Sequence, residues 1–311
     1  MSSTQQAHTR GTLLMLVLVM IWGSFLPVGK VALQQVDPYW LSSLRFGAAA
    51  AVFFVMLRLQ KAPLAIRFDR QHWHAAIFGV MGFTGFGICL FEGLRLTRPE
   101  IGAMILAIGP MLTALFQWWS TGRRPDAVTL AAIAVAICGL ALVVTEGDLS
   151  RLAGGDMLGN ALMIVGAIFW TAYTLGGQRF PDWSPTRYSA ITCLAGWIAI
   201  VVVTGVLTAS GYSRPPTPEG LYVVWPQLAF IIGVVSVFGI LIWNTAVAAI
   251  GPLSAGLIGN FAPVITYLIA LWQGRIPAAA ELAGVAVVLS ALVVNNLHQR
   301  RRLATPRLTP P

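Results

Sequence analysis

Two stretches of the chain decide its fold: residues 99–119 read PEIGAMILAIGPMLTALFQWW, and residues 252–272 read PLSAGLIGNFAPVITYLIALW. The second stretch repeats four landmarks of the first at the same spacing, 153 residues later: Pro99, Pro110, Thr113 and Trp119 correspond to Pro252, Pro263, Thr266 and Trp272. Each copy begins with a proline, carries a second proline inside an apolar segment, and ends on a tryptophan. The pattern predicts that the chain is built from two copies of one unit.

The composition predicts that most of the molecular surface faces lipid. Of 311 residues, 57% are apolar and 10% are charged, whereas soluble domains carry about 25% charged residues. A membrane-spanning helix needs ~20 apolar residues, and ten segments have that length: 12–34, 38–58, 75–96, 100–119, 127–145, 157–178, 186–208, 226–248, 253–273 and 278–297. Their length and the lack of long alternating stretches predict an all-α integral membrane protein.

The order of the predicted spans indicates that the two copies have opposite orientations. The second copy lies five spans further along the chain than the first, and an odd displacement inverts its orientation. We therefore expect two inverted five-helix repeats, residues 12–145 and 157–297, followed by a basic disordered tail, residues 298–311. Mid-span Trp22 and Trp170 keep the same order in both copies, as do Pro38 and Pro185 at span starts. Inverted repeats are typical of secondary transporters.

The net charge of +9 is explained by membrane topology and not by nucleic-acid binding. With the N-terminus inside, thirteen of the 20 lysines and arginines fall on the cytoplasmic side, five fall outside, and Lys30 and Arg45 lie within spans. This asymmetry follows the positive-inside rule. It predicts a multi-pass protein of the bacterial inner membrane with both termini in the cytoplasm and with membrane lipids as partners.

Pro110 and Pro263 lie well inside the fourth and ninth predicted spans. Each removes a backbone hydrogen bond, and in a membrane the freed carbonyl must be satisfied by a neighbouring helix or by water in a cavity. Two interpretations stay open: a fixed structural kink, or a hinge or free carbonyl that lines a transport pathway.

Several motifs, each weak alone, follow a fixed order along the chain: Trp22-Gly23-Ser24-Phe25, Leu44-Arg45-Phe46, Phe91 to Ala103 before Pro110, Trp243-Asn244 with Ala246-Val247, Gly251 to Pro263, and Gly284. With them, residues 13–297 resemble the EamA-type transporters of the drug/metabolite transporter superfamily. The resemblance implies a central cavity between spans 1–4 and 6–9, peripheral spans 5 and 10, and efflux of small metabolites, often amino acids. One departure is Gly274-Arg275-Ile276-Pro277, since family members often end the ninth span with Gly-Glu.

Seven residues at mid-depth or in the inner half of the membrane are candidates for binding substrate: Trp22, Ser24, Met104, Trp170, Tyr173, Asn244 and Asn260. An indole N–H at that depth needs a partner, and a neutral amide can bind backbone or substrate without burying a charge. Helix packing is the alternative role for each of them. Such walls suit an apolar or aromatic solute, including a zwitterionic amino acid.

Ionisable residues inside a membrane are functional candidates by default. Lys30, Arg45 and Glu92 fall in the outer third of predicted spans, and Arg95 lies one turn from Glu92 on the same helix face. A closed cluster of Glu92 with Arg45, Lys30 or Arg95 would form an extracellular gate, and a static ion pair with Lys30 reaching the headgroups is the alternative. Glu92 is also a candidate proton-coupling site, so coupling to protons and transport without a coupling ion both stay open.

The sequence argues against an enzyme and favours a carrier over a channel. The histidines lie at tails or helix edges, and no Gly-x-Ser-x-Gly, His-Glu-x-x-His, phosphate loop or metal spacing occurs, so we expect no catalytic residue, metal or cofactor. We expect an alternating-access exporter of small organic metabolites, as a monomer or homodimer. An importer, a facilitative uniporter or a channel-like permease of the same fold is the alternative.

Overall fold

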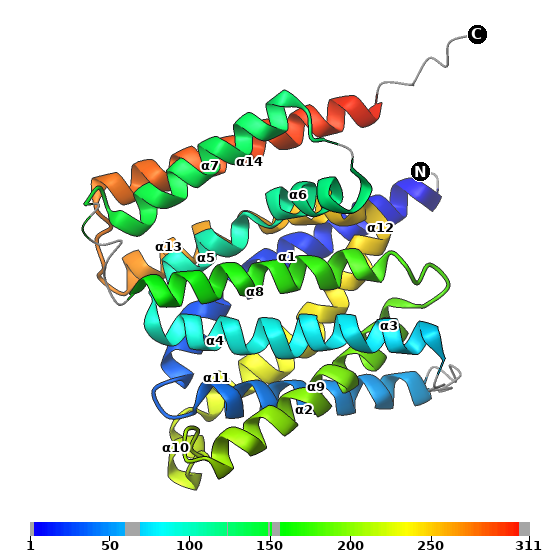
Figure 1. The fold of residues 1–311 in the computed structure, drawn as a ribbon, viewed down its shortest axis with the longest axis vertical. Helices are drawn as coiled ribbons and strands as arrows, with labels where there is room; N and C mark the ends of the chain where they lie inside the picture. The colour runs from blue at the N-terminus through cyan, green and yellow to red at the C-terminus, as the bar shows by residue number, and fades with distance from the viewer. Residues whose placement is uncertain (1–2, 60–68, 123, 149, 151–155, 305–311) are drawn as a thin grey trace.

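The computed structural model describes residues 3–59, 69–122, 124–148, 150 and 156–304, and these residues form helices joined by short connections, without a strand. The first half contains α1 (Ser3–Ala32), α2 (Pro38–Leu59), α3 (Arg70–Gly79), η1 (Val80–Gly85), α4 (Phe86–Leu96), α5 (Pro99–Ala107), α6 (Gly109–Thr121) and α7 (Ala127–Thr145). A π-helical stretch, η1, joins α3 and α4 into one rod (Figure 1).

The second half begins with α8 (Asp156–Gly177) and α9 (Pro185–Ala209), followed by the short α10 (Pro218–Val223) and α11 (Trp225–Ala229). A second π-helical stretch, η3 (Phe230–Gly239), leads into α12 (Ile240–Gly259), and α13 (Ala262–Trp272) and α14 (Ala279–Ala304) complete the chain. Each half therefore begins with two long helices, contains a π-helical stretch and ends with a long helix.

Eight helical stretches of the described residues are long and apolar enough to cross a membrane. They coincide with eight of the ten expected spans. The ninth, residues 100–119, is the pair α5 and α6, which is bent by 40°. The remaining expected span, residues 253–273, is not one continuous helix, because it divides between the end of α12 and the 11-residue α13.

Gly251 explains where the second half breaks. It has φ 80° and ψ 155° inside α12, a conformation that glycine adopts at no steric cost. A further break follows at Phe261, and Pro263 then lies in the first turn of α13, where its missing N–H costs no helical hydrogen bond. Pro263 was expected inside a continuous helix, and it lies instead at the start of a new helix.

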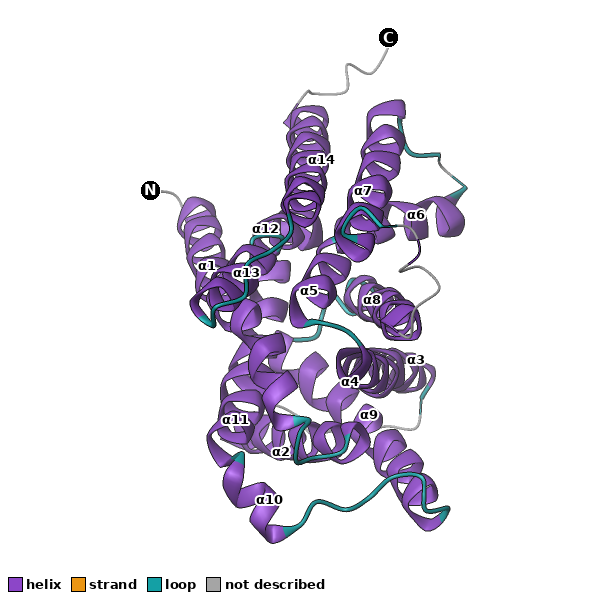
Figure 2. Ribbon diagram, turned by 90° about the vertical axis from the view of Figure 1, so that its left-hand side faces the viewer, coloured by secondary structure: helices purple, strands orange, loops and turns teal. Residues whose placement is uncertain are grey.

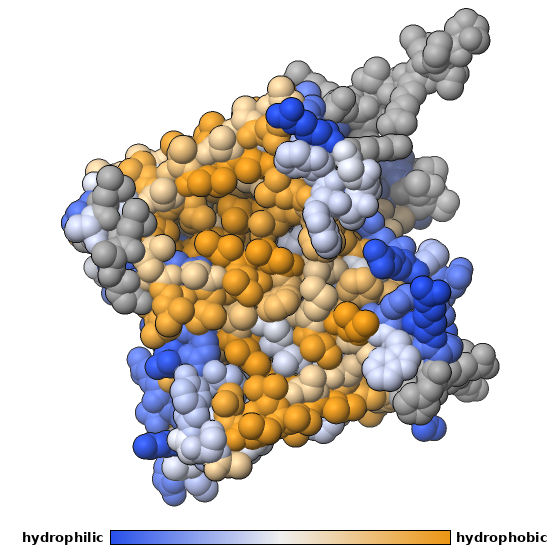
Figure 3. Space-filling view, viewed as in Figure 1, coloured by the Kyte–Doolittle hydropathy of each residue, from blue (hydrophilic) through white to orange (hydrophobic). Residues whose placement is uncertain are grey.

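The long helices run side by side with a polar region at each end. α1 begins and α14 ends at the same end of the bundle, on the right of Figure 1, where α2 also ends and α3 begins. A broad apolar band crosses the middle of the face shown in Figure 3, and hydrophilic residues gather at the two helix ends. This is the surface of a multi-pass membrane protein.

The helices form a main bundle and an outlying pair. Within the bundle α4 packs along α8, α2 along α9, and α1 along α12 and α13. α7 and α14 pack along each other through buried Ala136, Val143 and Val288, and they stand at one edge of the bundle in Figures 1 and 2. These two helices are the fifth and tenth expected spans, which the family resemblance places at the periphery.

The end of α14 differs from the expected tail. The helix continues to Ala304, so residues 298–304 are helical and not disordered, and residues 305–311 lie outside the described part of the chain. Gln, Arg, Leu and Ala fill positions 299–304; all favour helices, and basic residues are stabilised at a helix C-terminus. His298 Nε2 also lies 3.1 Å from Asp126 Oδ1 at the start of α7.

Candidate functional site

A cavity of about 140 Å³ lies at the centre of the main bundle. α1, α2, α4, α5, α6, α8, η3, α12 and α13 all contribute to its wall. Five aromatic side chains make up much of the lining: Trp22, Phe25, Phe86, Trp170 and Trp243. The cavity therefore draws on both halves of the chain and offers an aromatic surface to a ligand.

Three tryptophans form one cluster in the cavity wall. The ring centroids of Trp22 and Trp170 are 5.9 Å apart in an edge-to-face arrangement, and Trp243 lies 5.0 Å from Trp22 and 6.0 Å from Trp170. Trp243 Nε1 donates a hydrogen bond of 3.3 Å to Thr174 Oγ1, which provides the polar partner that a deeply placed indole requires. Aromatic rings held in this way form a rigid apolar surface.

The breaks in the two halves meet at the cavity. α5 ends and α6 begins around Ile108, and α13 begins after Phe261. These positions are again 153 residues apart, and Pro110 and Pro263, each two residues further on, both line the cavity. The two prolines thus occupy equivalent places at the site.

Asn260 connects the two breaks. When the side-chain amide is oriented with its nitrogen toward the neighbouring carbonyls, Nδ2 donates to Gly256 O at 3.0 Å and to Ala107 O at 2.8 Å. Ala107 is the last residue of α5 and precedes Asn260 by 153 residues. The amide thereby satisfies a carbonyl that the break leaves without its regular helical partner.

The structure brings three of the seven predicted substrate-binding residues to the cavity, namely Trp22, Trp170 and Asn260. Four others lie outside its wall: Ser24, Met104, Tyr173 and Asn244. The Ser24 hydroxyl donates to Met20 O in its own helix, the usual alternative for serine in a helix. Met104 is fully buried in the packed core.

Tyr173 and Asn244 bind each other and not the cavity. Tyr173 is fully buried beside the cavity-lining Trp170. Asn244 Nδ2 donates to Tyr173 Oη at 3.0 Å and to Ser189 Oγ at 2.7 Å. These contacts join α8, α9 and α12, so the Asn244 amide connects three helices.

Of the three cations expected as possible partners of Glu92, the structure places Arg95 against it. Arg95 pairs with Glu92 at 2.9 Å. Lys30 Nζ instead donates to the carbonyls of Leu94, Arg95 and Thr97 at 2.7, 3.1 and 2.8 Å. An ammonium group is stabilised there because the carbonyls at a helix C-terminus lack helical partners.

Arg45 has no ion pair with Glu92. Its guanidinium carbon lies 5.0, 4.2 and 5.1 Å from the ring centroids of Phe25, Phe46 and Phe91. The residue is 3% exposed and lines the cavity. Glu92 directly follows Phe91 on α4, but its carboxylate pairs with Arg95. Arg45 and Glu92 therefore belong to different sites.

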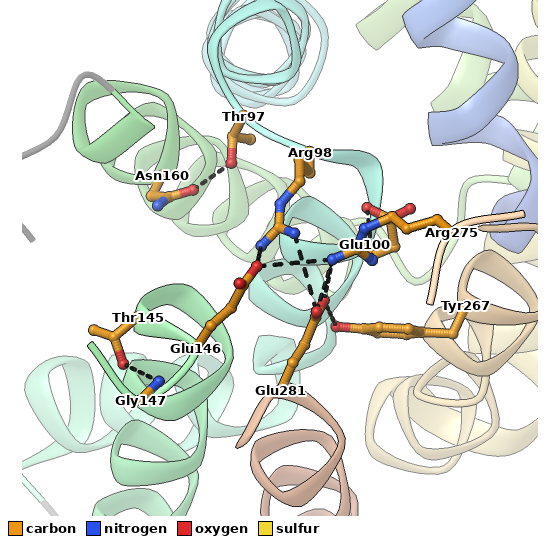
Figure 4. Close-up of polar contacts among 10 residues, drawn as sticks. All are labelled: Thr97, Arg98, Glu100, Thr145, Glu146, Gly147, Asn160, Tyr267, Arg275 and Glu281. Carbon is orange, nitrogen blue, oxygen red and sulfur yellow. Dashed lines mark hydrogen bonds and ion pairs between the residues drawn. The ribbon is translucent and has the colours of Figure 1, made fainter. Parts of the chain in front are cut away.

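A second ionic cluster, which the sequence did not reveal, lies where α5, α13 and α14 begin or end near the end of α7 (Figure 4). Its members are Arg98, Glu100, Glu146, Tyr267, Arg275 and Glu281. Arg275 Nη2 donates to both oxygens of the fully buried Glu281, at 2.9 and 2.7 Å. Tyr267 Oη donates to the same carboxylate at 2.9 Å.

The chemistry of this ionic cluster favours its charged form. Burial opposes the charge of Arg275, but the hydrogen bond to Glu281 and the charges of Glu100 and Glu281 outweigh it, so the pKa of Arg275 is raised. Arg98 also pairs with Glu146 at the end of α7. The cluster therefore connects the outlying α7 and α14 to the broken helices of the bundle.

Comparisons with known proteins agree with this architecture. The model of the EamA-like transporter family matches residues 9–145 and 157–297. The chain is 32% identical over 297 residues to the uncharacterized transporter YrdR of Bacillus subtilis, covering 94% of this chain and 92% of that one. It is 26% identical over 302 residues to the aromatic amino acid exporter YddG of Ancylobacter novellus, covering 95% and 100%.

Two further comparisons extend this result. A probable terminal-alkyne amino-acid exporter of Streptantibioticus cattleyicolor is 24% identical over 300 residues, which cover 94% of this chain and 96% of that protein. A solved crystal structure superposes with a TM-score of 0.67 over 93% of this chain and 98% of that one, at 20% identity. At that identity the superposition shows the fold alone.

Proposed function

Because the chain belongs to the EamA-like transporter family, we propose that it is a secondary transporter that exports small organic metabolites across the inner membrane by alternating access. The observation that supports this most strongly is the aromatic cavity at the meeting point of the broken helices of both halves. Amino acids or related compounds are the proposed substrates. One relative is named an aromatic amino acid exporter and another a probable terminal-alkyne amino-acid exporter, and these names support this class.

We further propose ten spans in two inverted repeats, residues 12–145 and 157–297. In this arrangement the part of α12 beyond Gly251 and α13 together form one broken span, equivalent to α5 and α6. The equivalent breaks at Ile108 and Phe261, each followed by a proline, support the assignment. Two copies of opposite orientation give a transporter two near-equivalent open states.

Both termini are proposed to lie in the cytoplasm. α1 begins and α14 ends at one end of the bundle, and Arg10, Arg58, Arg70 and Arg179 lie near that same end by their positions in the helices. The positive-inside rule assigns this end to the cytoplasm. The Glu92–Arg95 pair and the second ionic cluster then lie toward the outside.

In the proposed mechanism the cavity opens alternately to each side as the half-helices on either side of the breaks change their angle. A broken helix bends at the break at low cost, because the hydrogen bonds there are already missing. Asn260 links the two breaks in the state described here. We propose the Glu92–Arg95 pair as an outer gate, with a proton at Glu92 or no coupling ion at all as the two energetic schemes.

The alternative is an importer, or a facilitative uniporter or channel-like permease of the same fold. Direction depends on coupling and gradients, so the fold is compatible with either. A channel needs a continuous pore, whereas the site described here is a central cavity walled by packed tryptophans. This favours a carrier.

Counterflow in proteoliposomes tests the proposal. Candidates come from a screen for metabolites that cells overproducing the protein release. The purified full-length protein is then reconstituted and loaded with one unlabelled candidate, and uptake of the same labelled compound is measured. A carrier gives saturable uptake with a transient overshoot. Non-saturating flux without overshoot contradicts alternating access, and the absence of flux for every released metabolite contradicts the transporter proposal.

A further inference from the structure

Arg45 is a buried cation that pairs with no anion among the described residues. It projects from α2 and is 3% exposed, and it has no ion pair or hydrogen bond to another described residue. Its Nε and Nη1 atoms are both buried and lack hydrogen-bond acceptors. Buried polar groups are nearly always hydrogen-bonded, and charged residues inside a membrane almost always pair. An unpaired guanidinium here therefore needs a partner from outside the chain.

The rings around Arg45 stabilise the cation but do not satisfy its N–H groups. Phe25, Phe46 and Phe91 hold the guanidinium carbon 4.2 to 5.1 Å from their centroids. Cation–π attraction of this kind fixes the group in place. An aromatic face is a much weaker acceptor than a carboxylate, so the N–H groups of Nε and Nη1 still lack acceptors. Each of these two nitrogens lies on a different donor edge of the guanidinium, and Nη2 completes both edges.

The Arg45 side chain lies in the wall of the central cavity. Among the described residues that line this cavity, it alone carries a formal charge. Lys30, the other cation inside the spans, is not available to a ligand because three carbonyls occupy its ammonium group. The cavity thus combines aromatic walls with one positive charge.

We propose that Arg45 is the anion subsite of the central cavity and that it binds the carboxylate of a substrate whose apolar or aromatic body lies against Trp22 and Trp170. This inference rests on the proposed function and adds the substrate class: small organic monocarboxylates, including amino acids through their α-carboxylate. A guanidinium edge binds a carboxylate through two parallel hydrogen bonds. One bound carboxylate also neutralises the one charge.

The single charge selects a monoanion over a phosphate ester. A phosphate carries about 1.5 to 2 negative charges at neutral pH, and the cavity wall offers one compensating cation. The excess charge of a bound phosphate would stay uncompensated in an apolar environment, which is costly. A monocarboxylate without an ammonium group leaves no such excess.

Binding of matched probes to the purified full-length protein tests the assignment. 3-Phenylpropionate and 3-phenylpropionamide share one apolar body and differ in charge, and phenyl phosphate represents the competing anion. Dissociation constants follow from the concentration dependence of the melting temperature. The variants are Arg45→Gln, Arg45→Lys and, as a matched control, Arg58→Gln, which removes an exposed arginine at the other end of the same helix.

We expect wild type and Arg58→Gln to bind the acid at least tenfold more tightly than the amide, and Arg45→Gln to reduce this preference to less than threefold. Arg45→Lys keeps the charge but loses the planar fork, so its preference lies between the two. If Arg45→Gln does not yield folded protein, Arg45→Lys decides: a preference reduced at least threefold supports the subsite, and an unchanged one overturns it.

Three further results overturn the assignment: equal binding of acid and amide by wild type, a preference retained in Arg45→Gln, and tighter binding of phenyl phosphate than of 3-phenylpropionate. The transport function is tested separately in proteoliposomes. A protein that binds the acid selectively but gives no saturable flux contradicts the proposed function and leaves the Arg45 subsite intact. Saturable flux without any preference for the acid does the reverse.

Discussion

Gly23 on α1 packs tightly against α13, directly after the cavity-lining Trp22. A Cβ atom at this position would lie 2.4 Å from Ile265 Cβ and 2.7 Å from Ala262 O. Thr266 Oγ1 also donates to Gly23 O at 2.7 Å. Gly23→Ala therefore forces α1 and α13 apart, and Ala262, which lines the cavity, moves with α13.

The magnitude follows from these distances. Carbon atoms prefer separations of about 3.5–4.0 Å, so the two helices must separate by about 1 Å to accommodate the new methyl group. Overpacking of this kind costs about 1–3 kcal/mol. The higher helix propensity of alanine returns up to about 1 kcal/mol. We expect a net loss of about 1–2 kcal/mol in stability, together with a displaced cavity wall.

Thermal stability in detergent and counterflow in proteoliposomes measure the two effects. The matched control is Gly205→Ala on α9, because nothing lies within 4 Å of a Cβ atom at Gly205. We expect Gly23→Ala to melt below wild type and to lose most of its transport at equal protein amount. Gly205→Ala keeps both properties. Wild-type stability and transport in Gly23→Ala would refute the packing of α1 on α13.

Three further predictions concern other parts of the molecule. Glu281→Gln breaks the buried pair with Arg275, and we expect the protein to lose about 3 kcal/mol of stability. This is the lower end for buried pairs, because Arg275 is 26% exposed. An unchanged melting temperature would contradict the expectation. Trp22→Ala and Trp170→Ala each remove an indole from the cavity lining, so we expect transport to fall while expression persists. Unchanged transport in both variants would show that these residues are not part of the pathway. If Glu92 carries a coupling proton, Glu92→Gln abolishes the stimulation of flux by an imposed pH gradient and keeps counterflow; stimulation that persists excludes it as the coupling site.

The sequence predicted the helical membrane fold because spans of apolar residues are a local property. Trp22 and Trp170, which were chosen because they lie in the middle of their spans, line the cavity. Trp243 was missed because it lies near the end of the expected span 226–248, where tryptophan is common at the membrane interface. Its contact with the other two indoles depends on how the helices pack.

Charge pairing could not be predicted in the same way. Three glutamates lie at the ends of separate helices, namely Glu100, Glu146 and Glu281. The fold brings them to Arg98 and Arg275, and these contacts depend on how the helices pack. Partners three residues apart on one helix, such as Glu92 and Arg95, were within reach of the sequence. Partners across helices were not.

Two-sided accessibility of the cavity tests the central proposal most directly. Thr113 lines the cavity just beyond the break at Ile108, and Thr113→Cys in a background without Cys89, Cys138 and Cys193 gives it a single thiol. Alternating access predicts that a membrane-impermeant thiol reagent labels this cysteine both in intact cells and in inside-out vesicles, and that a transported substrate slows labelling from each side. Labelling from one side only, whatever the substrate, would contradict it.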